Sequence, residues 1–120
     1  MKYTTKVVSG KGRGKRLGFP TFNLLFPQTF NLRHGIHASW VWVKGKKYPG
    51  ALHYGPIPVF KQQAPTLEVF VINYHASIPI STIDFEPVKY LRPIKNFASK
   101  GALKSQIAKD VAAVRTILSE

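Results

Sequence analysis

The sequence predicts an antiparallel β-barrel with a C-terminal helix packed on it. Short apolar and β-branched runs recur at even spacing over most of the chain, and Gly, Pro and Asn residues separate them. The last part of the chain instead shows the apolar period of a helix. With 120 residues the chain is long enough to bury a core of its own. We therefore expect residues 1–120 to form a single domain.

Five runs are expected to form strands. The pattern places them at Lys2 to Ser9, Gly35 to Lys44, Lys47 to Tyr54, Thr66 to Tyr74 and Ile80 to Tyr90. Residues 44–47, Lys-Gly-Lys-Lys, predict a compact hairpin turn between the second and third of these strands. Three prolines, Pro56, Pro58 and Pro65, interrupt the chain and indicate a loop before the fourth strand.

A helix is expected over about residues 99–118. Ser99 is a suitable N-cap, because its hydroxyl can accept a hydrogen bond from a backbone N–H of the first turn. Apolar residues then recur at spacings of four, four, three and four, which places them on one face that packs on the barrel. These residues are Leu103, Ile107, Val111, Val114 and Leu118. On or beside the solvent face we expect Lys104, Lys109 and Arg115.

A glycine-spaced basic loop at residues 10–18 precedes an apolar turn that presents Thr21 and Asn23. Glycines let backbone N–H groups approach phosphate oxygens, and Lys and Arg supply countercharge. Thr21 and Asn23 offer neutral oxygens on one face of an extended segment. Arg16 excludes a P-loop, and Pro20 excludes the helix of a dinucleotide-binding turn. The pattern suits a polyphosphate that carries a divalent metal.

The charge of the chain is strongly basic. It carries 18 Lys and Arg residues against 5 Asp and Glu, a net charge of +13, which attracts ATP and, non-specifically, any nucleic acid. The absence of cysteine excludes disulfides, zinc–thiolate sites and a thiol nucleophile. No apolar run approaches the roughly 20 residues of a membrane span, and the N-terminus lacks a signal-peptide pattern. We therefore expect a cytoplasmic protein without a membrane partner.

The carboxylates of the chain all lie in its second half, and Glu68 is the first of them. A general base from the first half is therefore excluded. The period of two in this strand puts Leu67, Val69 and Val71 on one face, and Glu68 with Phe70 on the other. Two interpretations of Glu68 stay open, a carboxylate on a solvent face or a general base in a site.

Taken together, these segments resemble the riboflavin kinase family. Gly18-Phe19-Pro20-Thr21-Phe22-Asn23 is similar to the end of that family's phosphate loop, and Gly35-Ile36-His37-Ala38 to the start of one of its strands. Residues 67–71 are similar to its strand with a central glutamate, and residues 91–97 with the helix after them complete the order. The likeness covers nearly the whole chain. It implies a six-stranded, Greek-key-like closed barrel that uses ATP, riboflavin and Mg²⁺ and produces ADP and FMN.

The resemblance also implies roles for individual residues. Glu68 would be the catalytic base that takes the proton of the ribityl 5′-hydroxyl, and Thr21 and Asn23 would coordinate Mg²⁺. ATP binding is implied for Gly10, Lys15, Thr21, Asn23, Val71 and Asn73. Flavin binding is implied for Arg92, Lys95 and Phe97, since a flat heteroaromatic ring favours stacking and fixed donors. We expect a monomer whose reaction stops at FMN.

Two segments, 53–59 and 73–80, depart from the family pattern. His53 and Val59 stand where the family usually has Asn and Thr, and the second segment lacks the family's second acid and its Tyr-Gly. A flavin-binding protein without turnover and a basic nucleic-acid-binding barrel therefore stay open as alternatives. A histidine metal site is not expected, because His34 lies in an expected turn and no acidic or thiol partner lies nearby.

Overall fold

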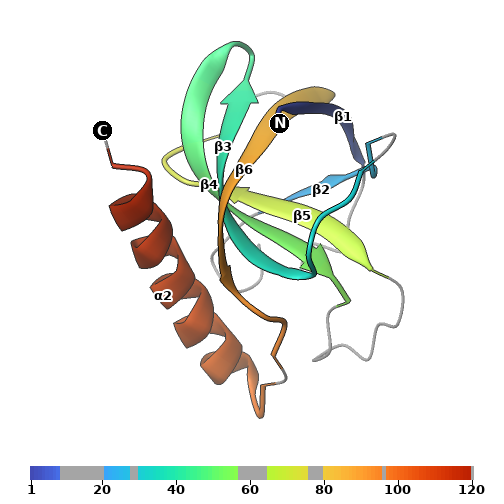
Figure 1. The fold of residues 1–120 in the computed structure, drawn as a ribbon. Helices are drawn as coiled ribbons and strands as arrows, with labels where there is room; N and C mark the ends of the chain where they lie inside the picture. The colour runs from blue at the N-terminus through green and yellow to red at the C-terminus, as the bar shows by residue number, and fades with distance from the viewer. Residues whose placement is uncertain (9–20, 28–29, 57–64, 76–79, 96, 120) are drawn as a thin grey trace.

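The computed structural model describes residues 1–8, 21–27, 30–56, 65–75, 80–95 and 97–119. These residues form six antiparallel strands that close into a barrel, with one helix along its side (Figure 1). The elements are β1 (Tyr3–Val8), β2 (Phe22–Leu24), β3 (Gly35–Val43), β4 (Lys46–Gly55), β5 (Thr66–Val71), β6 (Thr82–Arg92) and α2 (Lys100–Ile117). The strand order around the barrel is β1-β2-β5-β4-β3-β6, which confirms the predicted fold class.

The hairpin between β3 and β4 has the predicted compact turn. Val43 pairs with Lys46, so the turn consists of Lys44 and Gly45. Both residues have positive φ angles, 51° and 82°. Two such angles in a two-residue turn match the right-handed twist of the flanking strands. The turn therefore fixes the register in which β3 and β4 pair.

The observed strands depart from the predicted ranges most at β5, at the C-terminal end of β6 and at β2. β5 ends at Val71 rather than at Tyr74, because Asn73 has a φ of 67°, a left-handed conformation that turns the chain out of the strand. β6 extends to Arg92, which therefore lies on a strand. β2 is absent from the predicted strands, since three residues are too few to show a period. The predicted phosphate loop, residues 10–18, lies outside the described residues.

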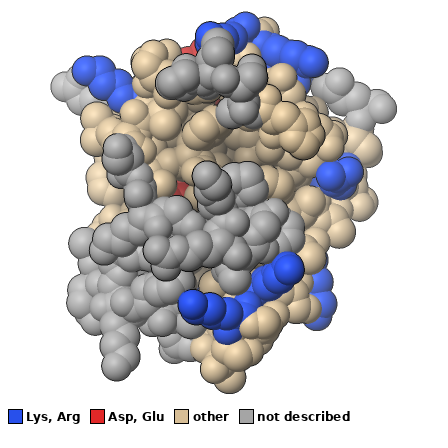
Figure 2. Space-filling model, turned by 180° about the vertical axis from the view of Figure 1, so that it is seen from behind, with Lys and Arg blue, Asp and Glu red and all other residues tan. Residues whose placement is uncertain are grey.

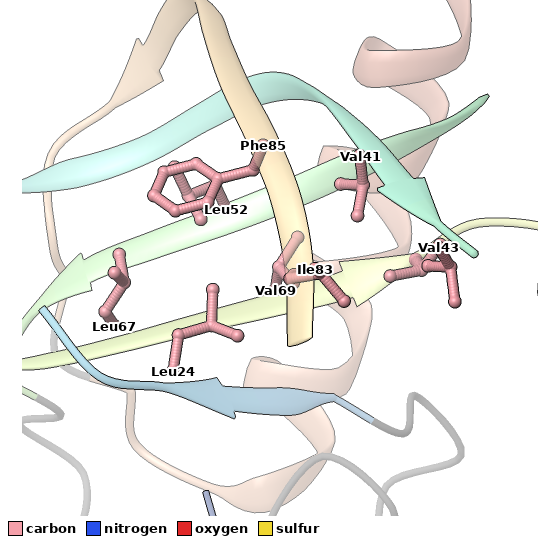
Figure 3. Close-up of a cluster of buried hydrophobic side chains, with 9 residues drawn as sticks. Leu24, Val41, Val43, Leu52, Leu67, Val69, Ile83 and Phe85 are labelled. Carbon is pink, nitrogen blue, oxygen red and sulfur yellow. The ribbon is translucent and has the colours of Figure 1, made fainter. Parts of the chain in front are cut away.

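Alternate residues of the strands fill the interior of the barrel. On β5 every second residue is buried, which leaves Glu68 and Phe70 facing outward as predicted. Gly50 lies where neighbouring side chains leave no room for a larger residue, because a Cβ atom there would lie 2.8 Å from a methyl group of Val41. The buried cluster consists of Leu24, Val41, Val43, Leu52, Leu67, Val69, Val71, Ile83 and Phe85 (Figure 3).

Helix α2 packs on the outer surface of β3 and β4. Ser99 caps it as predicted, since the Ala102 N–H donates to Ser99 Oγ over 3.1 Å. A second buried cluster joins Ala38 of the barrel to Val114 and Leu118 at the end of the helix. The predicted solvent face is also confirmed by the exposure of Lys104, Lys109 and Arg115. Among the described residues, no helix is long and apolar enough to cross a membrane.

An ion pair joins the helix to the last strand. Arg92 Nε donates to Asp110 Oδ1 over 2.8 Å, and Arg92 Nη2 donates to Asp110 Oδ2 over 2.7 Å. Gln106 Nε2 also donates to Asp110 Oδ1, over 3.0 Å. The side chains of Arg92 and Asp110 are only 13% and 7% exposed, so water screens their attraction little. The two-point geometry fixes the plane of the guanidinium.

This ion pair leads to a prediction about stability. Asp110→Ala leaves the Arg92 guanidinium in a nearly buried place without a carboxylate, so we expect the free energy of unfolding to fall by about 3 kcal/mol. Urea denaturation followed by circular dichroism measures the loss. Lys109→Ala truncates an exposed neighbour and should change stability by less than about 0.5 kcal/mol. Equal urea midpoints for Asp110→Ala and Lys109→Ala would show that the ion pair between Arg92 and Asp110 does not stabilise the packing of the helix.

Candidate active site

Five residues, one from each of five strands, line up across the outer surface of the barrel. Asn23 on β2 pairs with Glu68 on β5, and Glu68 pairs with His53 on β4. His53 also pairs with Ile36 on β3, which pairs with Arg92 on β6. Cross-strand partners point to the same side of a sheet, so these side chains share the outer face of Glu68. We call Asn23, Glu68, His53, Ile36 and Arg92 the outer row.

The spacing of strands sets the dimensions of the outer row. Asn23 and Glu68 are direct partners, so their Cβ atoms lie about 5 Å apart. Arg92 lies three strands further along from Glu68, and neighbouring strands are about 4.8 Å apart, so the two residues are about 14 Å apart along the surface. The predicted base therefore lies beside a predicted metal ligand, and the predicted flavin ligand lies at the other end.

Glu68 faces outward but is half-buried. Its position therefore matches neither a fully solvated surface carboxylate nor a fully enclosed general base. Thr66 Oγ1 donates to Glu68 Oε2 over 3.5 Å from the same face of β5. Thr21 immediately precedes β2, and the period of two places it on the same face as Asn23. The structure thus gathers hydroxyl, amide and carboxylate oxygens on one surface. The chemical roles of these oxygens stay predictions.

The other end of the outer row holds the residues predicted to bind a flavin. Arg92 Nη1 donates to Pro93 O over 3.0 Å, and the guanidinium lies over the ring of Phe97, 6.0 Å from its centroid. Because Asp110 holds Nε and Nη2 of the same guanidinium, the cation–π pair has a fixed orientation. Lys95 is exposed in the segment between the two residues.

The residues predicted to bind ATP lie in different parts of the molecule. Gly10 and Lys15 are outside the described residues. Val71 is only 4% exposed and belongs to the barrel core, so a contact with a nucleotide would have to use its backbone. Asn73 is exposed just beyond β5, where Arg115 Nη2 donates to its Oδ1 over 3.4 Å.

Two residues of this region are missing from the sequence predictions. Asp110 orients Arg92 through two hydrogen bonds. The sequence contains a signal for such a role, because a carboxylate among the apolar residues of a helix needs a cationic partner. His53 lies between Glu68 and Ile36 because β4 pairs with β5 on one side and with β3 on the other. No pattern in the sequence reveals that register.

His53 has an unusual environment. Its Nδ1 atom is buried and has no hydrogen-bond partner among the described residues. Burial lowers the pKa of His53 to about 4, and the positive charge of Arg92 acts in the same direction; together they outweigh the backbone groups of His53 and Pro56 near the ring, which favour the protonated form. The imidazole is therefore neutral near pH 7.

No three His, Cys, Asp or Glu side chains in the described part of the chain lie close enough to hold a metal ion together. A magnesium site does not require such a cluster. Mg²⁺ usually takes one or two protein ligands and keeps water or phosphate oxygens for the rest. Thr21 and Asn23 offer a hydroxyl and an amide oxygen, which are hard ligands of the kind that Mg²⁺ prefers. The donor set on the outer face therefore fits this ion.

The burial of His53 predicts a pH dependence of stability. The unfolded chain binds a proton at the ordinary histidine pKa of 6.5, whereas folded His53 binds it only near a pKa of about 4. Stability is therefore complete above pH 6.5 and falls by up to about 3 kcal/mol as the pH decreases to 4. His37, whose pKa burial also lowers, adds a loss of the same sign.

Urea midpoints at pH 7 and pH 4.5 measure this dependence. His53→Leu should lose clearly less stability over that interval than the parent, while His75→Leu, at an exposed position, should behave like the parent. The same loss in all three proteins would contradict the assignment to His53.

Comparisons with known proteins show which family the chain resembles. The model of the riboflavin kinase (flavokinase) family matches residues 1–118. The chain is 32% identical over 109 residues to the RNA-binding riboflavin kinase RibR of Bacillus subtilis. The matched region is 90% of this chain and 47% of that protein. This chain is also 29% identical over 122 residues to the bifunctional riboflavin kinase/FMN adenylyltransferase of Listeria monocytogenes. That match covers 98% of this chain and 39% of the relative.

Two solved structures share the fold. A crystal structure described as a macrolide-efflux protein from Streptococcus pneumoniae has a TM-score of 0.83 at 24% identity and covers 95% of this chain and 38% of that chain. The riboflavin kinase of Trypanosoma brucei has a TM-score of 0.65 at 22% identity and covers 99% of this chain and 80% of that chain. This chain spans less than half the length of the two curated relatives. Because the family model matches residues 1–118, nearly the whole chain, the protein belongs to the riboflavin kinase family.

Proposed function

We propose that this member of the family transfers the γ-phosphate of ATP to the 5′-hydroxyl of riboflavin, which gives FMN and ADP. The observation that carries the proposal is the pairing of Asn23 with Glu68. This pairing supports the proposal because a carboxylate lies beside an amide oxygen, and phosphoryl transfer to a hydroxyl uses a proton acceptor close to a ligand of the nucleotide's metal. Arg92, further along the outer row, offers a place for the flavin ring.

Glu68 accepts the proton of the attacking hydroxyl. As the new bond forms between the 5′-oxygen and the γ-phosphorus, the hydroxyl proton passes to a carboxylate oxygen of Glu68. The bond between the γ-phosphorus and its bridging oxygen breaks, and ADP leaves with the electron pair. The half-buried position of Glu68 supports this role, because it limits the water that would compete with the hydroxyl.

Thr21 and Asn23 would hold Mg²⁺ on the outer face. When bound, Mg²⁺ neutralises charge on the transferring phosphates. In this proposal these two side chains supply the protein oxygens for the metal, and Glu68 acts as the proton acceptor and not as a metal ligand. The cross-strand pairing of Asn23 and Glu68 keeps the two functions on neighbouring strands.

Arg92 and Phe97 bind the isoalloxazine ring, with Lys95 as a further donor. Asp110 accepts from two nitrogens of the Arg92 guanidinium and so limits its rotation before the flavin arrives. A contact that is already ordered costs less conformational entropy on binding. The ion pair that docks the helix therefore also prepares the flavin end of the site.

The charge of the chain favours an anionic nucleotide. Its net charge is +13, and on the face shown in Figure 2 Lys and Arg side chains lie at the top, at both sides and across the lower part, while very little acidic surface is visible. Such a field raises the local concentration of ATP. The ATP contacts in this proposal come from Gly10, Lys15, Thr21, Asn23, the backbone of Val71, and Asn73.

Two other functions predict different behaviour. The net charge of +13, together with the RNA-binding relative, favours a nucleic-acid-binding barrel, whose affinity would fall steeply with salt and would not respond to riboflavin. A flavin-binding protein without turnover would quench riboflavin fluorescence and form no FMN. Titration of riboflavin fluorescence with and without MgATP, followed by chromatography of the products, separates the three functions.

Removal of the proposed base gives a direct test of the reaction. We expect Glu68→Gln to lower kcat for FMN formation by a factor of about 10² to 10⁴ and to leave riboflavin binding nearly unchanged. Chromatographic detection of FMN measures the rate. Glu86→Gln is the matched control, because it changes an exposed carboxylate that contacts only the N-terminal amine among the described ion pairs. A Glu68→Gln rate equal to the parent rate would remove the catalytic role.

The proposed metal ligands predict a specific response to magnesium. Chelation with EDTA should abolish FMN formation, and excess Mg²⁺ should restore it, while riboflavin binding persists throughout. Thr21→Val removes one oxygen at nearly constant volume and should raise the Mg²⁺ concentration for half-maximal rate by roughly tenfold, equivalent to about 1.4 kcal/mol. Turnover that is unaffected by EDTA, or a Thr21→Val variant with the parent's Mg²⁺ requirement, would refute this metal site.

A further inference from the structure

His53 lies in the outer row between the two ends of the proposed site. Its strand partners are Glu68 on one side and Ile36 on the other. The side chain is partly exposed, yet its Nδ1 atom is buried and lacks a hydrogen-bond partner among the described residues. A buried polar atom without a partner is unfavourable in the free protein. It gains a bond when a ligand supplies the partner.

The position of His53 determines which part of a substrate it meets. A molecule whose terminal hydroxyl reaches Glu68 and whose ring reaches Arg92 must span about 14 Å, and it passes over His53 about 5 Å from Glu68. In riboflavin the ribityl chain, which carries secondary hydroxyls, joins the terminal hydroxyl to the ring. Ile36, the other residue between the two ends, is buried and apolar. His53 is therefore the polar member of this stretch of the outer row.

We propose that the imidazole of His53 hydrogen-bonds a secondary hydroxyl of the ribityl chain and so selects flavins that carry a polyhydroxylated chain. The inference rests on the proposed function, because Glu68 and Arg92 define the two ends of the bound substrate. It assigns His53 to specificity and positioning, whereas Glu68 carries out the proton transfer.

The chemistry of the imidazole suits this contact. One nitrogen of a neutral imidazole donates and the other accepts, and a hydroxyl can complement either one. Burial, with the charge of Arg92, lowers the pKa of His53 to about 4, so the ring is neutral at physiological pH. Rotation about the Cβ–Cγ bond exchanges the places of Nδ1 and Cδ2 without movement of the strand, so the ring has two orientations in which to meet a hydroxyl.

Two flavins that differ in the chain alone test the proposal. Lumiflavin has the ring of riboflavin with a methyl group in place of the ribityl chain, and fluorescence titration of the full chain measures the affinity of both. His53→Leu should weaken riboflavin binding by roughly threefold to tenfold and leave lumiflavin binding unchanged. His53→Asn keeps a donor and an acceptor, so it should bind riboflavin within about twofold of the parent.

Several results would overturn the inference. One such result is a His53→Leu variant that binds riboflavin with the affinity of the parent. Another is an equal loss of affinity for riboflavin and lumiflavin, because it indicates a general change of the site. If His53→Leu fails to fold by near-ultraviolet circular dichroism, His53→Ala carries the same expectation. Equal affinity of the unmodified chain for the two flavins also contradicts the proposal, whatever the variants do. A parent that binds riboflavin selectively but forms no FMN refutes the kinase function alone.

Discussion

The cross-strand register of the closed barrel is the constraint on which the candidate site depends. Asn23, Glu68 and Arg92 come from distant segments, and only pairing around the barrel brings them into one row. A shift of β5 by one residue would turn Glu68 into the core and an apolar side chain outward. Leu67 and Val69, which are 2% and 0% exposed, oppose such a shift because a shift by one residue would turn both side chains out of the core. Packing of the core thus determines where the chemistry can take place.

The sequence predicts the parts of this structure whose patterns are long. Alternation over β5 is enough to place Glu68 on the outer face, and the helical period from Ser99 is enough to place the apolar face of α2. β2 is too short to show a period. The position of His53 beside Glu68 depends on how β4 and β5 pair, and the sequence between the two strands lacks the two-residue turn pattern from which that register could be predicted.

Asp110 illustrates a different limit of sequence reasoning. An acidic residue among the buried positions of a helix indicates that a cation lies opposite, because an unpaired buried charge is costly. The sequence offers 18 Lys and Arg residues as that cation. Only the angle at which α2 crosses the barrel selects Arg92, and that angle results from packing between the helix and β3 and β4.

The origin of Asp110 in α2, after all six strands, has a consequence for biosynthesis. Ribosomes make a chain from its N-terminus, so the strands emerge before the helix. A barrel that closed before α2 docked would carry Arg92 without its counterion, because the guanidinium gains its two bonds to Asp110 only when the helix is in place. Docking of α2 is therefore the step that completes this end of the outer row.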